Sequence, residues 1–114
     1  MNIENHNEKV LKTKVENFLN SLGELSSKLN GDIYNIRGIF SQFAKDIPIR
    51  LDAGLSSSRG LMRRKNFAIA KETLNQCRTY LSILNSMRIV SVKELLNQID
   101  EINNLMENQL SREV

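Results

Sequence analysis

Residues 67–84 read FAIAKETLNQCRTYLSIL, and the spacing of their apolar side chains predicts a long amphipathic helix. Steps of three and four residues place one set of side chains on a single helical face: Phe67, Ala70, Leu74, Cys77, Leu81 and Leu84. The preceding segment 56–60 is rich in serine and ends in glycine, which interrupts the pattern. We therefore expect this helix to run from about Leu61 to Met87.

Three further stretches of the chain show the same helical periodicity. The first covers roughly residues 7–29, with residues 1–7 expected to fray, and the second extends from Ile33 to Leu55. The last opens at residues 91–94, whose Ser-Val-Lys-Glu sequence matches a capping box, and ends near Ser111. Gly31, between the first two stretches, suits the left-handed conformation that closes a helix.

These helices, joined by short connections, predict an all-α fold: an antiparallel up-and-down four-helix bundle in one domain over residues 1–114. Pro48 lies inside the second helix, where proline removes a backbone hydrogen bond, so we expect a kink near residues 44–48. The alternative is a three-helix arrangement in which Pro48 splits the second helix and one piece docks elsewhere.

Composition excludes several classes of protein. The chain has 114 residues, is 40% hydrophobic and contains one cysteine and one histidine, which excludes a disulfide scaffold and a zinc module. Aromatic residues make up 5% of the chain and tryptophan is absent, which argues against an aromatic platform for single-stranded nucleic acid. No signal peptide, transit peptide or membrane-spanning stretch is recognisable, so a cytoplasmic protein without membrane contact is expected.

Residues with catalytic potential are few and isolated. His6 lies in the polar N-terminal stretch with no partner at a defined spacing, and Cys77 lies between apolar residues, which favours a buried thiol. Asp100 and Glu101 are adjacent and so point about 100° apart on a helix, with no histidine nearby. No glycine-rich phosphate loop is present. We therefore expect no catalytic activity, no metal site and no cofactor.

Positive charge is concentrated in the middle of the chain. Residues 37–93 hold eleven basic and three acidic side chains, an excess of eight, whereas both flanking segments are net acidic. Six cations line the predicted third helix, three of them spaced by seven residues: Arg59, Arg63, Arg64, Lys65, Lys71 and Arg78. This basic ridge would neutralise phosphates of a nucleic acid. Alternatively, its cations pair with acidic residues of the first and fourth helices, within one chain or across subunits.

The predicted third helix also carries a second apolar set beside its main stripe: Ile69, Tyr80, Ile83 and Met87. Together the two sets cover close to half of the helix, more than a bundle helix normally buries. We expect the second set to contact another subunit. The alternative is that these side chains cover the edge of the core or remain singly exposed.

Two segments carry a resemblance to a known family. Residues 41–54, SQFAKDIPIRLDAG, resemble the second-helix motif of the small bacterial four-helix-bundle proteins through Gln42, Ile47-Pro48 and Gly54. Residues 67–74, FAIAKETL, followed by Leu81, are similar to the third-helix pattern. The family includes proteins encoded in intervening sequences of 23S ribosomal RNA genes and the accessory variability proteins of diversity-generating retroelements.

The chain also departs from the family pattern. Arg50 and Ala53 replace the usual asparagine and glutamate around the turn motif, and Gln76 replaces a glutamate of the third helix.

The resemblance implies a ring-shaped homopentamer without catalytic activity, and for the retroelement members it implies binding to a reverse transcriptase and to RNA. The expected function is therefore a non-enzymatic, homo-oligomeric accessory protein that binds RNA or DNA, as a partner of a retroelement reverse transcriptase. The alternative is a structural oligomeric scaffold that binds a protein partner without nucleic acid.

Overall fold

The computed structural model describes residues 3–29, 35–57, 60–88 and 91–111. These residues form helices and no strand, so the all-α prediction is confirmed. The helices in the described part are α1 (Ile3–Lys28), α2 (Ile36–Ser56), α3 (Leu61–Ser86) and α4 (Lys93–Ser111).

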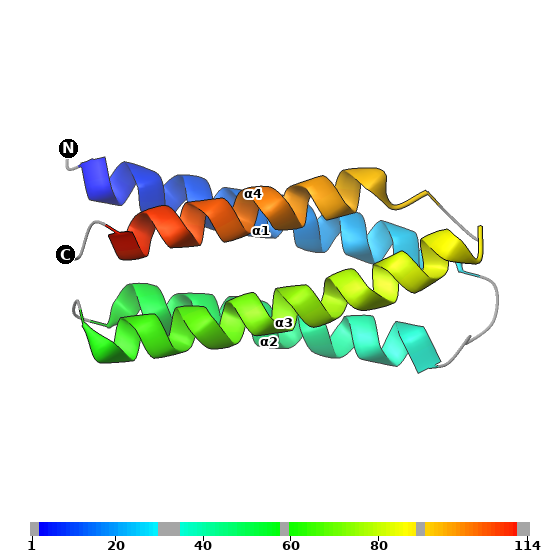
Figure 1. Ribbon diagram of the computed structural model, residues 1–114, viewed down its shortest axis with the longest axis horizontal. Coiled ribbons are helices and arrows are strands. Elements are labelled where there is room, and N and C mark those ends of the chain that lie inside the picture. Colours follow the sequence, from blue (N-terminus) through cyan, green and yellow to red (C-terminus); the bar gives the residue numbers. More distant parts are fainter. Residues whose placement is uncertain (1–2, 30–34, 58–59, 89–90, 112–114) are drawn as a thin grey trace.

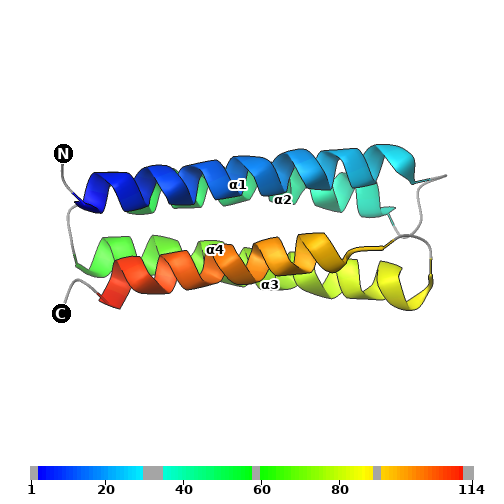
Figure 2. The same cartoon turned by 90° about the horizontal axis from the view of Figure 1, so that it is seen from above.

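The four helices lie side by side along the long axis of the molecule (Figures 1 and 2). Consecutive helices run in opposite directions, and the N-terminal end of α1 and the C-terminal end of α4 lie at the same end of the bundle (Figure 1). Within the described residues, each helix packs most closely against the two beside it, and α2 packs most extensively against α3. The structure is therefore a four-helix bundle with up-and-down topology.

The bounds of the helices follow the sequence pattern with two differences. Helix α1 begins at Ile3 rather than near residue 7, and α4 begins at Lys93, two residues after the predicted cap. Helix α2 continues through Pro48, so the three-helix alternative is wrong. The kink at Pro48 stays a prediction. The predicted turn at residues 30–32 and the start of the second stripe at Ile33 lie outside the described residues.

The core contains the predicted apolar stripes of all four helices. Phe43 of α2 and Leu74 of α3 lie in this core and are 7% and 0% exposed. Gly54 of α2 lies against Phe67 of α3, where a Cβ atom on the glycine would come within 2.5 Å of the aromatic ring. This glycine therefore allows the close approach of α2 and α3, the most extensive helix pair of the bundle.

Candidate interaction surfaces

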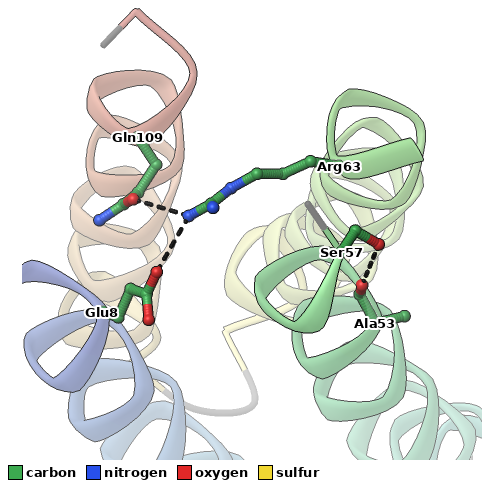
Figure 3. A network of polar contacts seen from close by, with 5 residues as sticks. All are labelled: Glu8, Ala53, Ser57, Arg63 and Gln109. Atoms are coloured by element: carbon green, nitrogen blue, oxygen red, sulfur yellow. Dashed lines mark hydrogen bonds and ion pairs between the residues drawn. The ribbon is translucent and has the colours of Figure 1, made fainter. Parts of the chain in front are cut away.

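Arg63, from the predicted basic ridge, lies at the end of the bundle where the chain termini meet. Only 8% of the residue is exposed. Its guanidinium Nη2 donates hydrogen bonds to Oε1 of Gln109 on α4 at 2.9 Å and to Oε1 of Glu8 on α1 at 3.3 Å (Figure 3). The guanidinium also lies 5.5 Å from the centroid of the Phe67 ring. Arg63 thus joins α3 to α1 and α4 inside the bundle and does not present its charge to solvent.

Glu8 joins the first turns of α1 to another helix of the bundle. The Glu8 side chain is 26% exposed and forms an ion pair with Arg63 of α3. His6 is exposed on the same part of the helix. The sequence around Glu8 is polar, so the apolar periodicity gives no sign of this contact with a residue far along the chain.

Lys71 and Arg78 lie on the side of α3 that faces α4. Lys71 forms an ion pair with Glu107, and Arg78 forms one with Asp100. The two cationic side chains are 37% and 36% exposed, whereas the carboxylate side chains are 55% and 57% exposed. The interpretation that ridge cations pair with acidic residues of the first and fourth helices is therefore confirmed for Arg63, Lys71 and Arg78.

The other predicted ridge residues lie near the start of α3. Arg64 and Lys65 are exposed on its first turns. Arg59 lies outside the described residues. The cations of the ridge therefore differ in burial: Arg63 is buried, Lys71 and Arg78 are partly exposed, and Arg64 and Lys65 are exposed.

The predicted oligomer surface lies on the opposite side of α3, beside α2. Ile69 and Tyr80 are half-buried, and the Tyr80 ring packs against Phe43 of α2 with the centroids 6.0 Å apart. Ile83 and Met87 are 39% and 45% exposed. Helix α2 therefore covers part of this apolar set and leaves its end near Met87 open.

A groove of about 400 Å³ lies at this open end. Its lining comes from both helices and is apolar: Ile36, Ile39, Tyr80, Ile83 and Met87. We call this feature the α2–α3 groove. The apolar excess of the α3 sequence predicts the wall from α3 but not the wall from α2, although Ile36 and Ile39 are three residues apart and so lie on the same side of that helix.

The chemistry-bearing side chains form no recognisable catalytic arrangement in the described residues. Cys77 is completely buried, and burial raises the pKa of its thiol to about 12, so the thiol stays protonated near neutral pH. The prediction of a buried cysteine is confirmed. Within the same residues, no cluster of three histidine, cysteine or acidic side chains could hold a metal ion.

Comparisons of the chain with protein-family models, curated proteins and solved structures found no match. Over the described ranges, none of the helices combines the length and the hydropathy needed to cross a lipid bilayer.

Proposed function

We propose that this protein is a non-enzymatic homo-oligomer that acts as a nucleic-acid-binding accessory protein. The observation that carries the proposal is the α2–α3 groove, in which Ile83 and Met87 remain 39% and 45% exposed in the single chain. Covering this apolar surface with a second copy of the chain removes it from water, which favours association. The resemblance to the bacterial four-helix-bundle family supports a ring of five subunits as the form of this oligomer.

Nucleic acid is the proposed ligand because positive charge is concentrated in residues 37–93, which hold eight more basic than acidic side chains. Arg63, Lys71 and Arg78 of this segment pair with carboxylates that lie outside it. Arg64 and Lys65 are exposed at the start of α3, and Lys45 and Arg50 are exposed on α2. A cyclic assembly repeats this surface in every subunit, so that weak phosphate contacts combine through effective concentration.

The proposal also covers the location and the partner of the protein in the cell. A cytoplasmic partner of a retroelement reverse transcriptase, with RNA as ligand, fits the family resemblance. Its support comes from that resemblance together with the exposed cations.

Two measurements test the proposal. Light scattering should give a mass well above 13.1 kDa, and Ile83→Glu with Tyr80→Glu should lower it while the helical circular dichroism is retained, because charges cannot be buried in the apolar contact.

Fluorescence anisotropy with RNA and DNA should show affinity that falls steeply with salt, because phosphate contacts release counterions. A monomeric mass would exclude the oligomer, and no binding at low salt would exclude the nucleic-acid function.

The control for the binding measurement is a matched pair of charge reversals. Arg64→Glu with Lys65→Glu should abolish binding, whereas Lys9→Glu with Lys12→Glu changes the net charge equally at exposed positions of α1. Equal loss in both double variants would show that only net charge matters.

The second candidate function is an oligomeric scaffold that binds a protein partner without nucleic acid. The pairs of Lys71 with Glu107 and of Arg78 with Asp100 favour it, because they neutralise the middle of the basic ridge within one chain. This candidate predicts a large mass in light scattering together with no salt-dependent binding of RNA or DNA.

A further inference from the structure

The start of α3 places exposed apolar and cationic side chains together. Leu61 is 80% exposed and Met62 is 57% exposed, so that Leu61 is the most exposed of the large apolar side chains in the described residues. Arg64 and Lys65, three and four positions after Leu61, are also exposed and lie on the same side of the helix as Leu61. We call these four residues the α3 tip. It lies at the end of the bundle that also holds the start of α1 and the end of α4 (Figure 1).

The stability of α3 does not explain why the α3 tip has these four side chains. The first turn of α3 contains no acidic residue, and cations near a helix N-terminus oppose the helix macrodipole. Leu61 and Met62 gain little from burial in the single chain because more than half of each residue is exposed. Gly60, with φ of 126°, leads into the helix.

We infer that the α3 tip is an apolar wedge that enters nucleic acid at a flexible or unpaired step, with Leu61 and Met62 against the bases and Arg64 and Lys65 on the flanking phosphates. This inference rests on the proposed nucleic-acid function and narrows the ligand to distorted or bulged duplexes. Leucine and methionine side chains act as such wedges because they replace part of the stacking at a step that is easily opened. Cations one turn away neutralise the phosphates on either side of that step.

Charge complementarity favours nucleic acid over other occupants of the tip. Two further cations, Arg50 and Lys45, are exposed on α2, the helix that precedes the tip. An anionic membrane would meet the apolar part of the tip through the exposed side chains of Leu61 and Met62 alone among the four tip residues. A neighbouring subunit is better matched to the α2–α3 groove, whose lining is apolar.

The test compares a fully paired RNA duplex with the same duplex carrying a bulge, both labelled for fluorescence anisotropy. The unmodified protein should bind the bulged duplex about tenfold more tightly, because the unstacking cost is smaller there. Leu61→Ser with Met62→Ser should remove this preference and leave the salt dependence of binding unchanged. Arg64→Gln with Lys65→Gln should weaken binding to both duplexes and lower the salt slope by about two, since each phosphate contact adds about one.

Ile49→Ser is the matched control, because Ile49 is 61% exposed on α2 outside the α3 tip. It should leave the preference for the bulged duplex intact. An unchanged preference in the Leu61→Ser, Met62→Ser variant would overturn the wedge while the proposed function stands, whereas no binding of either duplex at low salt would overturn both. A lower mass of that variant in light scattering would assign the tip to a subunit contact, and its loss of binding to phosphatidylserine vesicles would assign it to a membrane. Either result would overturn the wedge.

Discussion

The two sides of α3 differ in how completely the neighbouring helices cover or pair their side chains. On the side facing α4, Lys71 and Arg78 each meet a carboxylate of that helix. On the side facing α2, apolar residues meet only part of a neighbour, and Ile83 and Met87 stay open at the α2–α3 groove. Within the described residues, α3 therefore leaves apolar surface uncovered on one side while its cations on the other side are paired. Assembly should therefore depend on the α2 side, whereas ligand charge should act through cations that α4 does not neutralise.

The largest expected effect separates the core from the α2–α3 groove. Leu74→Ala should lower the free energy of unfolding by roughly 2–5 kcal/mol, because Leu74 is 0% exposed and its loss leaves a cavity. This cost should be the same at every protein concentration in urea denaturation. Ile83→Ala should lower stability only at concentrations where the oligomer forms, since assembly stabilises the folded chain by mass action. A concentration-independent cost for Ile83→Ala would place this residue in the core of one subunit.

An intermediate effect is expected at the buried end of the basic ridge. Arg63→Ala should lower the free energy of unfolding by about 1–3 kcal/mol, because it leaves Gln109 and Glu8 without their donor inside the bundle. Lys71→Ala is the comparison, and its cost should stay below about 1 kcal/mol because its pair with Glu107 is largely exposed. Urea denaturation at low and high salt measures both. Equal costs would mean that burial does not distinguish the two cations.

The helices were predictable because each one carries its own periodic stripe. The stripe around Leu74 gave the register and the bounds of α3 to within one residue. The contact of Glu8 with Arg63, a residue 55 positions away, was not predictable in this way. Periodicity reports which side of a helix is apolar, but it carries no information about which distant side chain meets a given polar group.

The same limit applied to the candidate sites. Spacing correctly grouped Lys71 and Arg78 on one side of α3, but it did not decide between phosphate binding and internal pairing. The alternative that involved the fourth helix proved correct for these two residues. The groove was half predictable, because the apolar excess of α3 is visible in its sequence while the contribution of Ile36 and Ile39 depends on how α2 packs beside it.

The smallest effect on stability, and the sharpest test of the side facing α4, comes from removing the carboxylates instead of the cations. Asp100→Asn with Glu107→Gln leaves Arg78 and Lys71 without their carboxylate partners and should change the free energy of unfolding by less than about 1 kcal/mol per pair. If these cations can bind phosphate, the variant should bind RNA more tightly than the unmodified protein. Its salt slope should rise by about two, one for each added phosphate contact.

The matched control is Glu16→Gln with Glu24→Gln, which raises the net charge equally at exposed positions of α1. A larger gain for the Asp100, Glu107 variant than for this control would show that position along α3 matters, because both variants attract polyanions equally at long range. Equal gains in RNA affinity would mean that the basic ridge acts only through the net charge of the protein. No RNA binding by either variant would favour the protein scaffold, since pairing with α4 would then be the whole role of Lys71 and Arg78.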